Sequence, residues 1–495
     1  MPIYWGDLHN HCGISYGYGS LANALEAARG QLDFCAVTGH AMWPDMPPRQ
    51  PGFEFVVDFH ERGFAKLAAH WEEVLAQVNA ANIEGEFVTF QSYEMHSRAY
   101  GDHHILSPAP DLPLVYADSP AALLTALGGR LAIAIPHHVA YVPDYRGIIW
   151  ERFDETISPL VEVYSKHGCG MADQAPYPYL HTMGPRDGRT TVRRGLALGH
   201  RFGYTASTDH HAGYPGSYGD GRVAVLAPSK TRQAIWEALL ARRAYAVTGD
   251  KIACRFELNG FPLGSELAAS RREIVLEIRA CDALDRITLY KNNRPWRVVE
   301  GPTLAPRPCE TYKVRLEMGW GWAPNGYLWE GDLRLKGGEL LGVETCFRGR
   351  SVLAPSQERA EDETINALEN RILSQSSDHL AWRCTSFQNY TTLHPATAAL
   401  ILEMRGDERT TLQVTLNGVR EEASLGELLE AARGVHIKPY NAEAFLLHRA
   451  VPEWAYRFYA EWVDDAPQGQ TDVYDAEVRQ VNGQYAWLSP VFVEK

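Results

Sequence analysis

The sequence predicts an α/β protein: a (β/α) barrel in the first half of the chain and a β-sandwich-like region with some helices in the second. Up to about residue 250, short apolar strands alternate with amphipathic helices, the pattern of parallel strands joined by helical crossovers. Beyond it, apolar and polar residues alternate at the period of half-exposed strands. Because 495 residues suffice for about two or three domains, we expect a barrel at 1–254 and a C-terminal domain at 255–495.

The first half divides into strand and helix units of ordinary length. Ser20 can cap the helix that begins at Leu21, and Gly30 can end it. The predicted strands are 3–8, 34–38, 87–93, 131–135, 160–164 and 204–207, and the predicted helices are 21–29, 61–80, 121–127 and 231–241. In a (β/α) barrel the carboxyl ends of the strands meet on one face, so residues far apart in the chain are expected to converge there.

The second half consists mainly of expected strands. They cover residues 256–259, 274–278, 287–290, 314–318, 327–335, 412–416 and 473–481. Helical patterns at 356–385 and 420–450 predict an α+β insertion at about 356–450. Trp320, Trp322 and Trp487 are expected to fill the core of the β-sandwich-like region.

The charge of the chain limits its partners. The net charge is -14 and there is no basic stretch, which argues against nucleic acid or an anionic membrane as the main partner. A small anionic substrate is compatible with this charge, because bound metal can reverse the local field. We expect a cytoplasmic protein for three reasons. The cysteines are scattered and show no CxxC spacing, no apolar run has membrane-spanning length, and the N-terminus does not resemble a signal peptide. The sequence leaves the oligomeric state open.

Histidines are concentrated in the first half of the chain. Fifteen of the 19 lie in residues 1–211, and eight of these form the pairs His9/His11, His103/His104, His137/His138 and His210/His211. A single histidine is usually an ordinary core or surface residue, but four pairs, most of them near the ends of apolar runs, are hard to explain in that way. Because imidazole is the commonest metal ligand among side chains, the pairs predict a metal site.

Acidic residues complete the predicted site. Glu94 closes the third strand and Asp209 follows the sixth. His9 and His11 stand at i and i+2, so both can face one ion from a strand. Mixed histidine and carboxylate ligands suit Zn²⁺, Mn²⁺ or Fe²⁺. Since the candidate ligands exceed what one ion needs, we expect a binuclear centre bridged by Glu94, an arrangement suited to hydrolysis and above all to that of phosphate esters.

The candidate residues occur in a recognisable order: Asp7-Leu8-His9-Asn10-His11, Thr38-Gly39-His40, Glu94, His103, His137 and Asp209-His210-His211. In this order the chain resembles the PHP superfamily, named for polymerase and histidinol phosphatase domains, over residues 3–250. The stretches Gly-Asp-His-His at 101–104, Ile-Pro-His-His at 135–138 and Arg-Ala-Tyr-Ala-Val-Thr-Gly-Asp at 243–250 resemble a poorly characterised subfamily with a β-rich C-terminal region. The resemblance implies a distorted seven-stranded (β/α) barrel that holds two or three divalent metal ions.

The resemblance also implies how the ligands are shared. One metal would be held by His9, His11, Glu94 and Asp209, a second by Glu94, His103 and His137, and a third with help from His40 and His211. Tyr16 and Gly39 stand where the family often has metal-binding residues, so we expect two firm metals and a third that is weak or absent. His40 and His211 would then bind the substrate or protonate its leaving group; with Asp209 they are the predicted catalytic residues.

Other polar residues have two open interpretations each. Asp7, His104, His138 and His210 adjoin the predicted ligands and are expected to pack or hydrogen-bond behind them. Glu162 is expected either to contact metal or substrate or to have a structural role. Lys166, His167, Arg98 and Tyr214 are candidates for binding an anionic substrate, with an ordinary structural or surface position as the alternative.

The hypotheses about function differ in the bond that is cleaved. The leading one is a metal-dependent phosphoesterase, in which a metal-activated hydroxide attacks a small phosphate ester. The alternative is a binuclear-metal hydrolase of a phosphotriester, lactone, ester or amide, favoured by the few arginines and lysines near the motifs. A non-catalytic binding module with a relic metal site is the third. No GxSxG or P-loop motif favours a serine hydrolase or a nucleotide-binding loop.

Overall fold

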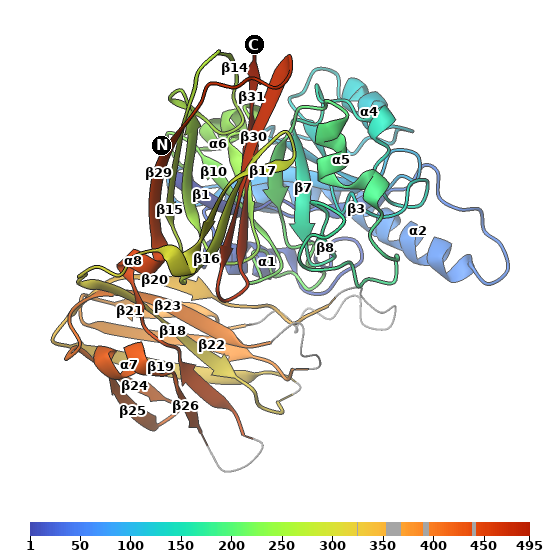
Figure 1. Ribbon diagram of the computed structural model, residues 1–495. Helices are drawn as coiled ribbons and strands as arrows, with labels where there is room; N and C mark the ends of the chain where they lie inside the picture. Colours follow the sequence, from blue (N-terminus) through green and yellow to red (C-terminus); the bar gives the residue numbers. More distant parts are fainter. Residues whose placement is uncertain (324, 353–367, 390–395, 438–441) are drawn as a thin grey trace.

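The structure, a computed structural model, describes residues 1–323, 325–352, 368–389, 396–437 and 442–495. It is a mixed α/β protein that is rich in strands. Figure 1 shows two parts: one contains the blue and green first half together with both chain ends, and the other is a lobe of yellow and orange strands. The predicted order, an α/β half followed by a strand-rich half, is therefore correct in outline.

One long sheet runs through the first part. The strands of the first half are β1 (Ile3–Asp7), β2 (Phe34–Ala36), β3 (Gly39–Met42), β4 (Val88–Met95), β5 (His103–Ser107), β6 (Ile133–Pro136), β7 (Leu160–Ser165), β8 (Gly168–Cys169), β9 (Gly203–Ala206), β10 (Arg222–Leu226) and β11 (Ala244–Val247). The long sheet has the order β6-β5-β4-β2-β1-β10-β11 and continues into strands from the second half. As predicted, β1, β2 and β4 are parallel, whereas β5 and β10 add in the antiparallel sense.

The predicted seven-stranded (β/α) barrel is not formed as a closed ladder. Among the described residues, β7 and β9 pair in a separate sheet with β8, and the long sheet ends at β6. The connection between β4 and β5 accounts for part of the difference, because residues 96–102 are too few for the helical crossover that a parallel neighbour needs. β5 therefore adds as a hairpin strand, which the sequence pattern did not predict.

The helices of the first half are α1 (Leu21–Arg29), α2 (Glu54–Ala69), α3 (Trp71–Ala81), α4 (Pro120–Ala126), α5 (Val192–Ala197) and α6 (Arg232–Leu240), with short 3-10 turns η1 (Trp150–Arg152) and η2 (Gly188–Thr190). Side-chain caps begin α1, α4 and α6, whereas α2, α3 and α5 have none. Ser20 Oγ accepts the amide of Asn23 at 3.2 Å, so the predicted cap of α1 is confirmed. The predicted helix 61–80 is two helices that meet at His70.

Two sheets pack face to face in the second part. One has the order β20-β23-β18-β27-β26 with β28 beside β18, and the other has the order β21-β22-β19-β24-β25. Their strands are β18 (Thr311–Gly319), β19 (Tyr327–Lys336), β20 (Glu339–Cys346), β21 (Arg371–Gln375), β22 (His379–Ser386), β23 (Ala398–Arg405), β24 (Thr411–Leu416), β25 (Val419–Ser424), β26 (Arg433–His436), β27 (Ala444–Leu447) and β28 (Val451–Pro452). Side chains of both sheets, Leu316 and Leu333 among them, form one buried apolar cluster.

Leu333 gives a test of this two-layer core. Its side chain is fully buried in the cluster, so Leu333→Ala is expected to lower the free energy of unfolding by about 2–5 kcal/mol, through lost transfer energy and the cavity left behind. Chemical denaturation measures the change. The control is Leu341→Ala on β20, where the side chain is 38% exposed and a change within about 0.5 kcal/mol is expected. Equal losses for the two variants would contradict the core assignment.

The predicted insertion at about 356–450 contains less helix than expected. Its residues 356–367 lie outside the described part of the chain. The predicted helix at 368–385 is wrong, because Leu380, Trp382 and Cys384 are buried at every second position of β22, which is the period of a strand. Helical structure in the described remainder of the insertion is confined to α7 (Leu425–Glu430), which begins at a capping box.

Strands of the second half return to the first part. They are β12 (Ala253–Leu258), β13 (Phe261–Pro262), β14 (Glu266–Ala268), β15 (Arg272–Arg279), β16 (Leu284–Lys291), β17 (Arg294–Glu300), β29 (Arg457–Asp464), β30 (Thr471–Gln480) and β31 (Tyr485–Glu494), with η3 (Gly301–Thr303) and α8 (Glu453–Tyr456). β31 pairs with β11, and Figure 1 shows the red strands β30 and β31 upright beside the green strands. Tyr245, Leu276 and Leu488 share one apolar cluster, so a boundary between residues 254 and 255 stays a prediction.

The tryptophans of the second half differ in burial. Trp487 is fully buried, but it packs with first-half residues such as Val161 and Tyr204 and not in the predicted sandwich core. Trp320 and Trp322 are 41% and 66% exposed, so their predicted place in the core is wrong. They follow the end of β18, where Trp320 turns the chain with a φ of 64°. Among the helices that the structure describes, none combines the length and apolar character that a membrane span needs.

Candidate metal centre

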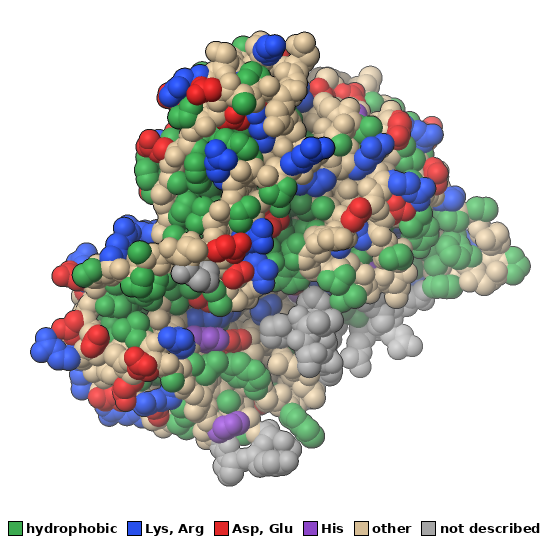
Figure 2. Space-filling view, viewed as in Figure 1, with side chains coloured by type: hydrophobic (Ala, Val, Ile, Leu, Met, Phe, Trp, Pro, Cys, Tyr) green, Lys and Arg blue, Asp and Glu red, His purple; other side chains and the backbone are tan. Residues whose placement is uncertain are grey.

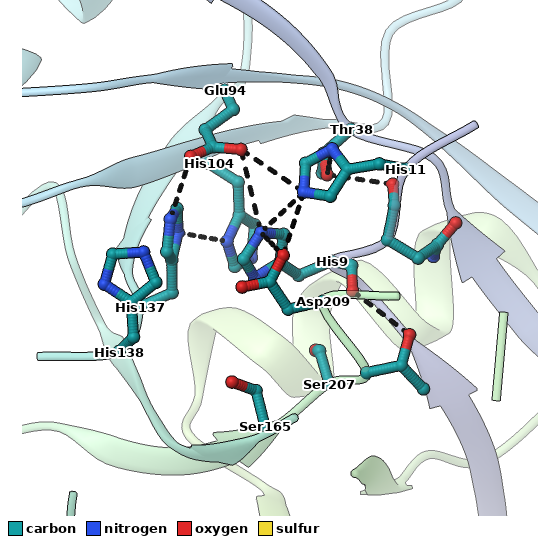
Figure 3. A network of polar contacts seen from close by, with 12 residues as sticks. His9, His11, Thr38, Glu94, His104, His137, His138, Ser165, Ser207 and Asp209 are labelled. Atoms are coloured by element: carbon teal, nitrogen blue, oxygen red, sulfur yellow. Dashed lines mark hydrogen bonds and ion pairs between the residues drawn. The ribbon is translucent and has the colours of Figure 1, made fainter. Parts of the chain in front are cut away.

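The centre of the site is a group of four buried side chains from three parts of the chain. His9 and His11 follow β1, Glu94 lies near the end of β4, and Asp209 follows β9. Backbone hydrogen bonds join the first and last of these segments: the amide of Asp209 donates to the carbonyl of His9, and the amide of His11 to the carbonyl of His210, both at 2.8 Å. The four predicted ligands therefore converge, as Figure 3 shows.

The donor atoms of these four residues are spaced like the ligands of one ion. His11 Nε2 lies 3.1 Å from both His9 Nε2 and Asp209 Oδ1, and 3.4 Å from Glu94 Oε2. His9 Nε2 lies 3.4 Å from Asp209 Oδ1 and 3.8 Å from Glu94 Oε2. Ligand atoms about 2.0–2.1 Å from a tetrahedral ion lie about 3.3–3.4 Å from one another. The residues present therefore fit a divalent cation.

Glu94 offers one oxygen to each of two groups of histidines. Its Oε2 faces His9 and His11, and its Oε1 lies 3.1 Å from His137 Nε2. Among the described residues, the buried Oε2 accepts no hydrogen bond. His40 Nδ1 lies 2.9 Å from it but is not a hydrogen-bond partner. A buried carboxylate oxygen left in this way costs free energy unless a cation neutralises it. This position agrees with the bridging role expected of Glu94.

The second group contains His104 rather than the predicted His103. His104 Nδ1 lies 3.3 Å from His137 Nδ1, and its ring stacks on that of His9 with centroids 5.0 Å apart. Its Nε2 is buried without a hydrogen-bond partner among the described residues. His9, His104 and His137 thus form a group of donors that could hold an ion.

His103 lies on the other face of β5. Neighbouring residues of a strand point to opposite faces, and only one of this pair can turn to the group. His103 Nδ1 donates to the carbonyl of Gly101 at 2.9 Å, and the ring lines a small cavity with Ile148 and Phe153. The structure therefore does not bring His103 together with Glu94 and His137 as the sequence analysis expected.

A third group surrounds His40 and His211. Their Nε2 atoms are 3.3 Å apart, and the ring of His40 stacks on that of His11 at 3.9 Å. Burial lowers the pKa of both His40 and His211 well below the usual value, and the neighbouring His11 lowers them further. Both rings are therefore neutral, which is the form that binds metal.

Both departures from the family pattern have structural explanations. Tyr16 stacks on His40 with centroids 3.7 Å apart, and its hydroxyl is hydrogen-bonded to His96 Nε2 at 2.9 Å, so an aromatic ring occupies the place of a ligand. A Cβ at Gly39 would lie 2.5 Å from Leu67 Cδ1 on α2, so a carboxylate side chain at this position would require the Leu67 side chain to move.

His96 and Asp102 belong to the site and were not predicted. His96 Nδ1 lies 3.1 Å from Glu94 Oε1, and Asp102 accepts a hydrogen bond from Arg146 at 2.5 Å and is 3.2 Å from His96. Burial alone would raise the pKa of Asp102, but Arg146 and His96 hold it below its usual value. His96 is two residues after Glu94, which is the same spacing as between His9 and His11. This spacing could have identified His96 from the sequence.

Residues behind the ligands hold them in place. Glu162 Oε2 lies 3.1 Å from His9 Nδ1, so Glu162 orients a ligand instead of reaching the cavity. Burial raises the pKa of Glu162 to about 7, although the neighbouring His9 acts to lower it. Asp7 accepts hydrogen bonds from the backbone of His9, Thr208 and Gly216, and so fixes loops rather than an imidazole. His210 is buried as expected, whereas His138, 3.4 Å from Asp102, is not behind the ligands but lines the cavity described below.

The predicted substrate-binding residues lie in different surroundings. His167 contacts Asp209 Oδ2 at 2.8 Å and the hydroxyl of Tyr141 at 2.7 Å. Lys166 is paired with Asp220 at 3.4 Å, and Tyr214 is buried with its hydroxyl bonded to Asn370. His167 and Arg98 line the cavity described next, whereas Lys166 and Tyr214 do not.

A cavity of about 670 Å³ opens beside the candidate ligands. The polar part of its lining includes Glu94, Asp209 and His211, and the apolar part includes Trp43 and Phe59. Its volume lies within the range of about 300–1,000 Å³ that is usual for small-molecule sites. The candidate centre is therefore accessible to a substrate from this cavity.

Comparisons with known proteins give only distant likenesses. No protein-family model matches the chain. An uncharacterised protein of Chlamydia pneumoniae is 26% identical over 224 residues, 41% of this chain and 35% of that protein, and one of Chlamydia muridarum is 27% identical over 150 residues, 27% and 24% respectively. The chain thus spans about a third or less of the length of these curated relatives.

Two solved structures show a weak similarity to this chain. One is a two-domain protein of Bacteroides vulgatus described as containing a predicted PHP-like metal-dependent phosphoesterase, with 16% identity, a TM-score of 0.34, and coverage of 59% of this chain and 79% of that one. The other is the lesion-specific endonuclease PfuEndoQ of Pyrococcus furiosus, with 14% identity, a TM-score of 0.29, and coverage of 48% and 56%. Scores this low establish neither a common fold nor a common substrate.

Proposed function

We propose that the chain is a metal-dependent hydrolase of the PHP superfamily, acting on a small-molecule substrate. The observation that carries the proposal is the spacing of His9, His11, Glu94 and Asp209 around one point beside the cavity. The metal would be Zn²⁺, Mn²⁺ or Fe²⁺, because the donors are mixed imidazole and carboxylate. The predicted cytoplasmic location and the catalytic unit at 1–254 remain part of this proposal.

The proposed ligand sets follow the three groups of donors. The first ion would be held by His9, His11, Glu94 and Asp209. The second would be held by His137, either through Nε2 with Glu94 Oε1 or through Nδ1 with His104, which replaces His103. A third ion, held either by His40, Glu94 and His96 or by His11, His40 and His211, would be the weakest, because Tyr16 packs against His40. We therefore retain two firm metals.

In the proposed mechanism, the residues around the cavity have different roles. When bound, divalent ions here would acidify a water molecule and stabilise negative charge on the substrate's oxygens. Glu162 and Asp209 position the rings of His9 and His167, respectively, through the contacts described above. His211 and His40 line the cavity and, as neutral rings, are placed to bind the substrate. Donation of a proton to the leaving group would require one of them to be protonated first.

A phosphate ester is the proposed substrate class. Arg98 and Arg146 line the cavity and can attract an anion, although the guanidinium of Arg146 is already bonded to Asp102. The net charge of -14 argues against nucleic acid as a partner. Figure 2 shows acidic and basic side chains interspersed over the face in view.

The second candidate keeps the metals and changes the bond to a carboxylic ester, lactone, amide or phosphotriester. Lys166 forms an ion pair with Asp220 and lies outside the cavity lining. The apolar residues that line the cavity suit an uncharged substrate. Turnover of p-nitrophenyl phosphate and p-nitrophenyl acetate by Mn²⁺- or Zn²⁺-loaded protein separates the two candidates. We expect faster turnover of the phosphate, abolished by a chelator; chelator-resistant hydrolysis would contradict a metal-dependent mechanism.

Glu162 gives a test of the positioning role. Glu162→Met fills the same space but accepts no hydrogen bond from His9, so metal affinity is expected to fall about 10–100-fold. Competition with a chromophoric chelator measures the affinity, and Glu151→Met at an exposed position is the control. The same affinity in both variants would show that the Glu162–His9 contact is unimportant.

A further inference from the structure

The cavity beside the candidate metal centre has an aromatic wall. Trp43 follows β3, Phe53 precedes α2, and Phe59 lies on α2; all three line the cavity, with Val56 and Pro47 between them. These residues belong to one continuous stretch of the chain, residues 43–59, that contains none of the proposed ligands. The wall is therefore a feature of the cavity that the proposed chemistry does not explain.

The aromatic rings continue from the proposed ligands to the wall. Tyr16 stacks on His40 at 3.7 Å, and Phe59 packs against Tyr16 with centroids 4.6 Å apart. Trp43 is within 5.7 Å of the ring of His96, and Arg146 lies over its face at 4.7 Å. A group attached to the reacting part of a substrate would thus meet an apolar surface directly.

Charges in the described cavity lining are few outside the centre. Arg146 is bonded to Asp102 and covers Trp43, and Arg98 Nε donates to the carbonyl of Asp144. The lining contains no lysine among the described residues. A second anionic group on the substrate, such as that of a diphosphate, would therefore find few cationic partners in the cavity. An apolar group would be transferred from water to an apolar surface, which is favourable.

We infer that the site takes substrates in which the hydrolysed ester carries an aryl or similarly large apolar group, seated on Trp43, Phe53 and Phe59. This inference rests on the proposed hydrolase function and names its substrate class. The cavity of about 670 Å³ has room for such a group beside the centre. The leaving group, and not only the reacting bond, would then determine which esters are hydrolysed.

The test compares two leaving groups of similar acidity but different size. Phenyl and 4-biphenylyl esters, each as phosphate and as acetate, are given to the metal-loaded protein and kcat/KM is measured. Burial of the additional ring is expected to favour the biphenylyl ester about tenfold or more, whichever bond is cleaved. Equal kcat/KM values for the two leaving groups would overturn the inference while leaving the hydrolase proposal intact.

Variants of the wall locate the effect. Phe59→Ala is expected to bring the biphenylyl-to-phenyl ratio close to one. Phe53→Ala should also lower the ratio. Because the ring of Phe53 contacts Phe55 and not Tyr16, this variant guards against an indirect effect on the centre. Phe261→Ala is the matched control, because Phe261 is 51% exposed on β13 and outside the cavity. A ratio that survives both wall variants would contradict the assignment.

A binding measurement separates this inference from the proposed function. Calorimetry with non-hydrolysable phenylphosphonate and 4-biphenylylphosphonate needs no turnover. Tighter binding of the biphenylyl compound that is lost in Phe59→Ala would support the aromatic wall, whether or not the four esters are hydrolysed. A lack of hydrolysis of all four esters would count against the hydrolase proposal and not against the wall. Equal binding of the two phosphonates would contradict the wall alone.

Discussion

Glu94→Gln is expected to abolish metal-dependent hydrolysis and to empty the metal centre. The substitution keeps the size of the side chain but removes the charge from the residue that faces both groups of histidines. Loss of a residue behind a ligand costs about 10–100-fold in metal affinity, so loss of a shared ligand should cost more than about 100-fold. Mass spectrometry of metals in the purified protein, together with kcat/KM on the best ester, measures the effect.

Glu73→Gln is the matched control for this substitution. Glu73 lies on α3 with its side chain 67% exposed, so neither metal content nor hydrolysis should change. Circular dichroism of both variants checks that the fold is kept. Full metal content and wild-type turnover in Glu94→Gln would mean that Glu94 is no ligand.

His104→Ala and His103→Ala are expected to differ sharply although the residues are neighbours. His104 Nδ1 meets His137 and its ring stacks on His9, whereas His103 faces away from this group. His104→Ala should therefore lower the metal-to-protein ratio from about two toward one, with turnover reduced at least about tenfold. His103→Ala should leave the metal content unchanged.

The pair contains its own control, because both substitutions remove a buried imidazole from β5. Thermal unfolding of the two variants shows whether a loss of stability contributes to either result. If His103→Ala instead loses the second metal and His104→Ala keeps it, the ligand set implied by the family resemblance is correct and the one proposed from the structure is wrong.

The sequence predicted strands well where burial follows a simple period. The Ser20 cap, the parallel strands β1, β2 and β4, and the strands around the sandwich core were recognisable from local pattern. The hairpin strand β5 was not, because its histidines were interpreted only as possible ligands and residues 103–107 were assigned to no strand. The return of β30 and β31 to β11 depends on contacts across more than 200 residues, for which local periodicity gives no signal.

The candidate site was predictable where ligands occur in alternating pairs. His9, His11, Glu94, His137 and Asp209 converge as the strand-end argument expected. His103 was named because the family resemblance pointed to it. Which of two adjacent histidines faces the site depends on strand register, which the resemblance did not fix. The aromatic wall could not be predicted, because residues 43–59 show no spacing that distinguishes cavity lining from ordinary core.

The most direct test of the account is an anomalous diffraction map from crystals grown with Mn²⁺ or Zn²⁺. We predict one peak about 2.0–2.3 Å from the donor atoms of His9, His11, Glu94 and Asp209, and a second beside Glu94 Oε1 and His137. A metal-replete crystal with no peak between these four side chains would contradict the claim that they are gathered to hold a catalytic cation.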